Sequence, residues 1–226
     1  MLQDIYFQYK GATLMLFNRE GEEVAFRGTA FLIHPEGYLL TAAQLITGLT
    51  DLMVVPMVES SGFTPVRDET VAPMEVEIRQ VDRWRDIALL KFSNETEVSM
   101  PAHVMGAPDE IAVGNTTACI GFPFGYYHIY TQLIRQSAIA GKILTRNQTR
   151  IFLFDALVHD GTLGAPLINI YDGRIIGLVG GRFYPPELMP EHLKHKAETP
   201  IKTDISYAIS IDHARQLMEK EGLTPI

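Results

Sequence analysis

The chain has 226 residues, of which 46% are hydrophobic and 20% charged, and its formal net charge is −8 with a sequence pI of about 5.3. That length suits one compact domain or two small barrels that share a core. The acidic balance and the lack of a Lys/Arg run argue against a duplex-binding surface, since phosphate binding needs clustered cations, so we expect no nucleic-acid partner.

The first half of the chain is dominated by strand-like segments. Residues 18–21 and 34–37 have the composition of hairpin turns. A short helical turn is expected at 44–49, and a polar, proline-bearing stretch at 93–110 would link two halves. Apolar runs rich in β-favouring residues predict strands at 12–17, 24–33, 38–41, 52–57, 74–81 and 87–92.

The second half repeats this rhythm and ends in a helix. Strands are predicted at 116–121, 131–140, 150–158, 166–169, 174–181 and 206–211, with an Asp-Gly turn at 172–173. The final helix would be capped by Ser210 or Asp212 and stopped by Gly222, with an apolar stripe at Ile211, Ala214, Leu217 and Met218. Many short strands and few helices predict an all-β barrel architecture, although composition leaves one sandwich or two barrels open.

The N-terminus and the cysteine content give information on the cellular compartment of the protein. Cys119 is the single cysteine, so an intrachain disulfide cannot form, and its apolar neighbours predict a buried structural thiol. No segment approaches about 18 consecutive apolar residues, so we expect no membrane span. Residues 1–6 lack a basic region followed by an apolar stretch and do not read as a signal peptide. We therefore expect a cytoplasmic location, provided that the chain is not trimmed from an exported precursor.

Three short segments are laid out like the catalytic triad of a serine protease. Residues 41–44 read Thr-Ala-Ala-Gln, 86–91 read Asp-Ile-Ala-Leu-Leu-Lys, and 160–167 read Asp-Gly-Thr-Leu-Gly-Ala-Pro-Leu. Their order resembles the chymotrypsin-like serine proteases, most closely the HtrA/Deg branch, which reads Thr-Ala-Ala-His, Asp-Ile-Ala-Leu and Gly-Asn-Ser-Gly-Gly-Pro. Residues 28–41, 120–125 and 207–212 also resemble family segments, in the same order.

The resemblance implies a fold class. It is all-β, with two six-stranded antiparallel β-barrels of the chymotrypsin-like kind and a C-terminal helix. Residues 1–100 would form the N-terminal barrel, and residues 101–226 the C-terminal barrel plus the terminal helix. Together they would make one protease domain with no PDZ domain, and the family places its substrate cleft between the barrels.

Two of the three triad positions carry other residues. In the family frame the histidine is Gln44 and the serine is Leu163, while Asp86 is retained. An amide has no basic nitrogen near neutral pH, and leucine has no heteroatom that could attack a carbonyl. Losing one triad member typically removes on the order of a million-fold of rate. The resemblance therefore implies an inactive pseudoprotease, without cofactor, that acts as a protein-binding or complex-assembly subunit.

Local structure around the lost residues is expected to persist. Gln44 can donate its amide N–H to Asp86, so we expect a structural hydrogen bond between them. The turn that forms the oxyanion hole in the family would remain as a vestige, because its glycines are kept. It consists of Gly161, Thr162, Leu163 and Gly164.

A first alternative is a peptide-binding module that uses the old substrate cleft. In the family, substrates pair as an extended strand with the segment that corresponds here to Val179, Gly180 and Gly181. Leu157 lies where the family places the floor of the primary specificity pocket, which would suit an apolar side chain. The resemblance is thus compatible with two kinds of partner, an extended peptide or a folded protein.

A second alternative is a hydrolase with a rebuilt active site. Thr162 adjoins the vacant serine position and His159 lies three residues upstream, so a Thr/His pair is one version. A Cys/His pair that uses Cys119 is the other. Both need the new nucleophile to reach a general base.

The segment 182–204 is long, polar and proline-bearing, as functional or disordered loops are. Its start, Phe183, Tyr184, Pro185 and Pro186, could anchor a partner. His192 and His195 have the i, i+3 spacing of one helix face, but no zinc motif accompanies them and we expect no metal. A homo-oligomer is left open, because the N-terminal residues Ile5, Tyr6, Phe7 and Tyr9 could pack against a neighbour.

Overall fold

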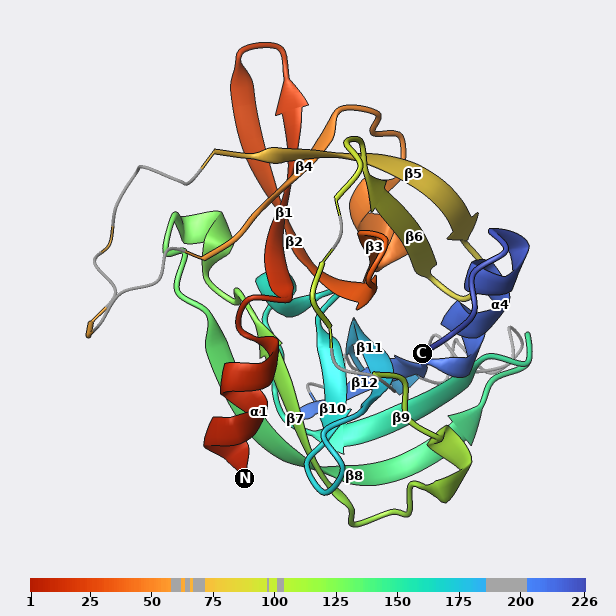
Figure 1. The fold of residues 1–226 in the computed structure, drawn as a ribbon. Coiled ribbons are helices and arrows are strands. Elements are labelled where there is room, and N and C mark those ends of the chain that lie inside the picture. Colours follow the sequence, from red (N-terminus) through yellow and green to blue (C-terminus); the bar gives the residue numbers. More distant parts are fainter. Residues whose placement is uncertain (58–61, 64–65, 67–71, 97, 101–103, 186–202) are drawn as a thin grey trace, which may run out of the picture.

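The strands close into two six-stranded antiparallel barrels in the computed structural model, which describes residues 1–57, 62–63, 66, 72–96, 98–100, 104–185 and 203–226 (Figure 1). Both barrels have the same strand order, since β1-β2-β3-β6-β5-β4 is matched by β7-β8-β9-β12-β11-β10. The expected chymotrypsin-like fold class is confirmed. The first barrel contains β1 (Thr13–Glu20), β2 (Glu23–His34), β3 (Tyr38–Thr41), β4 (Leu52–Val55), β5 (Met74–Asp82) and β6 (Ile87–Phe92); the second contains β7 (Thr116–Gly121), β8 (Leu133–Leu144), β9 (Arg150–Asp155), β10 (Pro166–Asn169), β11 (Ile175–Arg182) and β12 (Ile205–Ser210).

The strands between the two barrels are apolar on both faces. In β3, Leu39 packs inside the first barrel, whereas its neighbour Leu40 joins the core shared with the second barrel. In β6, Leu90 likewise packs inside the first barrel, and Leu89 joins the shared core. Successive side chains of a strand point to opposite faces, so a strand buried on both sides needs a continuous apolar run. This is why these segments lack the polar alternation of a half-exposed strand.

A helix at the N-terminus, α1 (Leu2–Tyr9), was not anticipated from the sequence. It packs beside β7 of the second barrel (Figure 1). Ile5 and Tyr9 are buried in the shared core, and the Tyr9 hydroxyl donates to the Gly173 carbonyl oxygen at 2.5 Å. The expectation that these two side chains could pack against a neighbour is therefore wrong, because the chain's own second barrel covers them. Phe7 remains exposed.

The C-terminal helix, α4 (Asp212–Lys220), packs against β5 and β6 of the first barrel (Figure 1). The predicted side-chain cap by Ser210 or Asp212 is wrong, since the N-cap is Ile211 and no side chain caps the helix. The Asp212 carboxylate instead accepts hydrogen bonds from Arg150 and from the Ser210 hydroxyl. Each terminal helix thus lies against the barrel that is farther from it along the chain.

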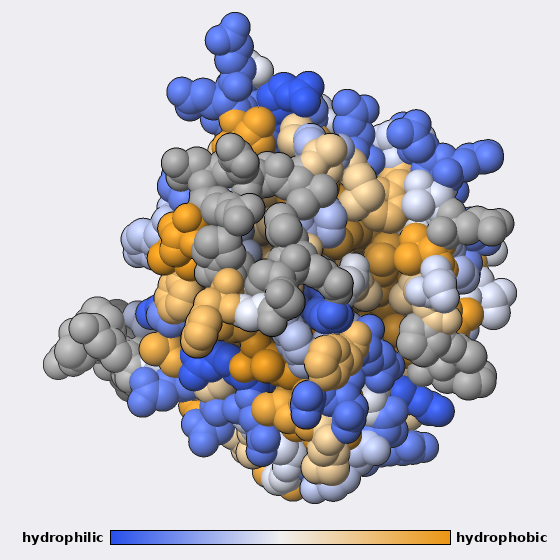
Figure 2. Space-filling model, turned by 60° about the vertical axis from the view of Figure 1, so that its left-hand side comes forward, coloured by the Kyte–Doolittle hydropathy of each residue, from blue (hydrophilic) through white to orange (hydrophobic). Residues whose placement is uncertain are grey.

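The outer surface mixes polar and apolar side chains. On the face shown in Figure 2, hydrophilic residues gather at the top, and hydrophobic and hydrophilic residues are mixed below them. Within the described ranges, the most exposed aromatic rings belong to Phe63, Trp84 and Tyr127. In the same part of the chain, no helix has the length and apolar character needed to cross a bilayer.

Replacement of Tyr9 by alanine tests whether α1 belongs to the fold. We expect Tyr9→Ala to lower the free energy of unfolding by about 3 kcal/mol or more, because it leaves a cavity and removes the hydrogen bond to Gly173. The exposed Phe7 is the matched control, and Phe7→Ala should change stability by less than about 0.5 kcal/mol. Urea unfolding followed by circular dichroism measures both, and equal effects would contradict the docked helix.

Candidate functional site

Gln44 and Asp86 form a hydrogen-bonded pair at one end of the first barrel. Gln44 lies in a 3₁₀ turn (Ala43–Ile46) directly after β3, and Asp86 immediately precedes β6. Asp86 has a φ of 57°, a left-handed backbone that aspartate tolerates better than most residues. The Gln44 backbone N–H donates to Asp86 Oδ1 at 2.7 Å, and Gln44 Nε2 donates to Oδ2 at 2.5 Å. The expected hydrogen bond is present, and a second bond from the backbone supports it.

The Gln44 amide also joins the two barrels. Its Nε2 donates to the Gly180 carbonyl oxygen of β11 at 3.2 Å. A side-chain amide has two N–H donors, so both donors of Gln44 are engaged, one by each barrel. The arrangement holds Gln44 in place and uses the Gly180 carbonyl oxygen that would otherwise face the space between the barrels.

The carboxyl group of Asp86 is partly buried. Burial raises the pKa of Asp86 above its ordinary value, although the N–H groups of Gln44 and Ala43 act in the opposite direction by stabilising the charged form. The folded state therefore holds the Asp86 proton more tightly than the unfolded chain does. The carboxylate costs stability once it is ionised in the folded protein.

The turn at 161–164 is closed by its own hydrogen bonds. Residues Asp160–Thr162 form a 3₁₀ turn in which the Thr162 N–H donates to the His159 carbonyl at 2.8 Å. The Leu163 N–H donates to the Asp160 carbonyl at 3.1 Å. An oxyanion hole needs backbone N–H groups that point at a substrate oxygen. The Leu163 N–H, which the family resemblance places in that hole, is bonded within the loop instead.

Two glycines of this turn are required by close packing. Gly164 has a φ of +82°, and a Cβ there would lie 2.1 Å from the Thr29 carbonyl oxygen. A Cβ on Gly161 would lie 2.2 Å from the Phe122 carbonyl oxygen. Neither position has room for a side chain, so the glycines that the sequence analysis singled out are needed by the fold itself.

Thr29 in β2 fixes this turn against the first barrel. Its backbone N–H donates to the Leu163 carbonyl at 2.9 Å, and its hydroxyl donates to the Gly161 carbonyl at 2.7 Å. The hydroxyl also accepts from the Phe122 N–H at 3.3 Å. Thr29 is fully buried. The sequence analysis missed this positioning residue, and the available signal was a polar side chain inside an apolar strand.

The proposed peptide cleft lies next to the turn. The Gly164 N–H donates to the Val179 carbonyl of β11, which places the two segments side by side. At Gly180 the ring of Tyr207 lies so close that a Cβ would come within 2.3 Å of it. Gly181 is buried in the same strand and pairs with Tyr207, and Leu157 is partly buried. The structure thus brings Gln44, Asp86, the turn and β11 together.

The candidate replacement nucleophiles are buried. Cys119 is 1% exposed, and burial raises the pKa of its thiol to about 11. Thr162 is 4% exposed. The His159 ring packs against Phe124, with 5.3 Å between the ring centroids. Across the described ranges, no group of three or more metal-ligating side chains occurs.

The proposed partner loop is only partly described. The Phe183 N–H donates to the Ile205 carbonyl at 2.9 Å, and the side chain packs against the shared core, so Phe183 extends the barrel. Tyr184 is exposed and Pro185 is partly buried. Pro186, His192 and His195 lie outside the described residues.

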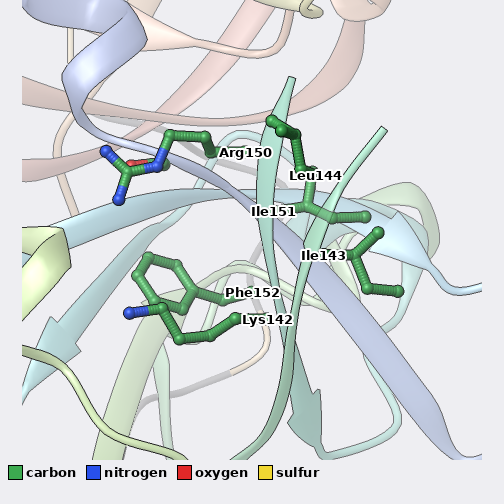
Figure 3. Close-up of a pocket in the computed structure, with 7 residues that line it drawn as sticks. Lys142, Ile143, Leu144, Arg150, Ile151 and Phe152 are labelled. Atoms are coloured by element: carbon green, nitrogen blue, oxygen red, sulfur yellow. The ribbon is translucent and has the colours of Figure 1, made fainter. Parts of the chain in front are cut away.

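Two surface hollows lie away from Gln44. One, of about 280 Å³, is on the β8–β9 hairpin, where the Lys142 amine approaches the ring of Phe152 (Figure 3). The Lys142 amine also donates to the Pro108 and Ile111 carbonyls, so it is occupied within the protein. The other, of about 570 Å³, is next to the end of β5 and contains Trp84.

Comparison with known proteins gives consistent matches. A family model described as a trypsin-like peptidase domain matches residues 28–178. The chain is 30% identical over 158 residues to a probable periplasmic serine endoprotease DegP-like of Halomonas elongata, covering 70% of this chain and 30% of that protein. It is 29% identical over 168 residues to serine protease HTRA1 of Xenopus laevis, covering 73% and 33%.

A solved structure shows the same fold. The HtrA-type protease AlgW with tripeptide superposes with a TM-score of 0.70 at 22% identity, covering 99% of this chain and 65% of that one. The chain spans about a third of the length of the two sequence relatives.

The Thr29 hydroxyl should contribute measurably to stability. We expect Thr29→Val to lower the free energy of unfolding by about 1–3 kcal/mol, because it leaves the Gly161 carbonyl and the Phe122 N–H without a partner in a buried site. Thr29→Ser keeps the hydroxyl and should retain most of that stability. Denaturant titration compares the variants, and a valine variant as stable as the wild type would refute the positioning role.

The raised pKa of Asp86 predicts a pH dependence of stability. The contribution of this group is greatest below the ordinary Asp pKa and falls as pH rises through the folded value. Asp86→Asn cannot ionise, so the wild type should lose stability relative to this variant as pH rises above the ordinary Asp pKa of about 4. Urea unfolding of both proteins across that range measures the difference. A wild type that gains on the variant as pH rises would show that the pKa is lowered instead.

Proposed function

We propose that this chain, which belongs to the trypsin-like peptidase domain family and to its HtrA branch, is a catalytically inactive member that acts as a protein-binding or assembly subunit. The observation that carries the proposal is that the side-chain amide of Gln44 is held by hydrogen bonds to both barrels. This residue stands at the histidine position of the family frame, and its two amide donors are bonded to Asp86 and to Gly180.

Triad chemistry needs a base and a nucleophile that exchange a proton. Gln44 offers an amide that cannot take up a proton near neutral pH, and Leu163 offers no atom that could attack a carbonyl. The Leu163 N–H is bonded to Asp160, so a donor for the oxyanion is also lacking. Removing one such donor costs about 10²–10³ in rate by itself. These three deficits all affect the attack on the substrate carbonyl, and together they support negligible hydrolysis.

A rebuilt hydrolase receives less support. Cys119 is buried and its raised pKa keeps the thiol protonated near neutral pH, whereas a catalytic cysteine needs an accessible thiolate. Thr162 is also buried, and its bond to His159 joins backbone atoms.

Peptide binding along β11 has a specific obstacle. An extended peptide that pairs at Gly180 would compete with Gln44 for the carbonyl oxygen of Gly180. The proposal therefore favours a folded partner or a surface outside this cleft. The cytoplasmic location and the oligomeric state stay predictions.

A proteolysis assay tests inactivity. We expect no turnover of casein or of a fluorogenic peptide library above background at neutral pH, since the base and the nucleophile are both replaced. Incubation with fluorophosphonate and chloroacetamide probes, followed by intact-mass spectrometry, should show no adduct at Thr162 or Cys119. Robust turnover that Asp86→Ala abolishes would overturn the proposal.

A subunit role needs a separate measurement. The protein purified from its native source at native expression level should elute in size exclusion with a stoichiometric companion, identified by mass spectrometry. A chain that elutes alone as a monomer would contradict an assembly role while leaving inactivity intact.

A further inference from the structure

The hollow of about 570 Å³ lies where both barrels and the C-terminal helix meet. It is lined by the last two residues of β5 and the turn that follows them (residues 81–85), by Asn147 of the β8–β9 hairpin and by Lys220 at the end of α4. Figure 1 shows the end of β5, the β8–β9 hairpin and α4 close together on the right-hand side. The hollow is distinct from the space between Gln44 and the turn at 161–164. We call it the Trp84 pocket.

The Trp84 pocket is basic on an acidic chain. The whole protein has a net charge of −8, yet the lining holds Arg83, Arg85 and Lys220 against the single carboxylate of Asp82. Asp82 is already paired with Arg85 at 2.8 Å. Arg83 and Lys220 are exposed, and neither makes an ion pair within the described ranges. Two cations are therefore free to meet an anionic ligand.

Trp84 adds a large apolar surface to the same lining. It is the one tryptophan of the chain, and 84% of it is exposed. Exposed tryptophan has an unfavourable contact with water, and tryptophan and arginine are the residues most enriched at binding hot spots. An indole in the same lining as the free Arg83 and Lys220 suits a ligand that combines carboxylates with an apolar side chain.

The turn that carries Trp84 is held in place from both barrels. The backbone N–H groups of Trp84 and Arg85 donate to Asp82 Oδ1 at 3.1 and 3.0 Å. From the second barrel, Asn147 Nδ2 donates to the Trp84 carbonyl at 2.9 Å. A backbone that is already fixed loses less conformational entropy when a ligand binds. The turn therefore presents Arg83 and Trp84 in a preorganised way.

We propose that the Trp84 pocket binds an acidic peptide segment of a partner protein. Its carboxylates pair with Arg83 and Lys220, and an apolar side chain of the segment covers the Trp84 ring. This inference rests on the proposed role as a binding subunit and assigns the chemistry of its partner. A nucleic acid fits less well, because two free cations on a chain of charge −8 do not match a row of phosphates.

Trp84 fluorescence provides a direct test. The probe is the N-acetylated peptide Glu-Glu-Leu-Phe-Glu-Glu, which contains no tryptophan, and the full-length protein is titrated with it at low salt. Because Trp84 is the one tryptophan, saturable change in its emission reports occupancy of this pocket. We expect binding that weakens as salt is added. The matched peptide with Gln in place of every Glu should bind about tenfold more weakly or not at all.

Variants locate the site independently of Trp84 fluorescence, with a fluorescein-labelled peptide and anisotropy as the readout. Arg83→Glu, Lys220→Glu and Trp84→Ala should each weaken binding by about tenfold, since each removes a recognition element. Arg174→Glu, an exposed charge reversal on the β10–β11 turn, is the control and should leave affinity within about twofold.

Three outcomes would overturn this inference. They are no saturable binding up to about 1 mM peptide, equal losses in the Arg174→Glu control, or tighter binding of a ten-nucleotide oligo(dT) than of the peptide. The outcome is separable from that of the proposed function. An inactive protein with a stoichiometric companion whose binding is unaffected by Arg83→Glu and Trp84→Ala would keep the subunit role and reject the pocket.

Discussion

Thr29 makes hydrogen bonds to three residues in two segments of the second barrel, the turn at 161–164 and Phe122, and the geometry of the candidate site depends on them. Its N–H and hydroxyl hold the carbonyls of Leu163 and Gly161, and the hydroxyl also receives the Phe122 N–H. Each bond is buried, so breaking one leaves a polar group without water. The turn at 161–164 therefore cannot move independently of β2. Gly164 fits only because its missing Cβ leaves room for the Thr29 carbonyl.

Gln44 adds a second connection between the barrels. Its contacts with Asp86 and Gly180 span the region where the family resemblance locates proton transfer. A histidine in that position would exchange protons, whereas an amide can only hold its partners. In the function that we propose, Gln44 therefore has a structural role at the position where the family resemblance places a catalytic residue. Partial burial of the Asp86 carboxylate is the cost, because no cationic imidazolium can form beside it.

The turn at 82–85 and the Gln44–Asp86 pair are adjacent in the chain, since Asp86 follows Arg85 directly. One carboxylate, Asp82, organises the turn, and the next, Asp86, organises Gln44. The β8–β9 hairpin contributes Asn147 from the other barrel, and α4 contributes Lys220. None of the residues that line this hollow takes part in triad chemistry, so the proposed binding site and the proposed loss of catalysis are independent of each other.

The sequence by itself indicated the fold class and pointed to Gln44, Asp86 and Leu163 as the residues that the family resemblance aligns with the triad. Apolar runs at 38–41 and 87–92 predicted strands because a short continuous apolar run is a local feature of the chain that is typical of a strand buried on both faces, and the order of the short motifs indicated two barrels. Tertiary structure decided the docking of α1 through Tyr9, the role of Thr29, the closed turn before Leu163 and the Trp84 pocket. These features join residues up to 164 positions apart, as Tyr9 and Gly173 are. No local pattern encodes such contacts, because they exist only once both barrels have closed.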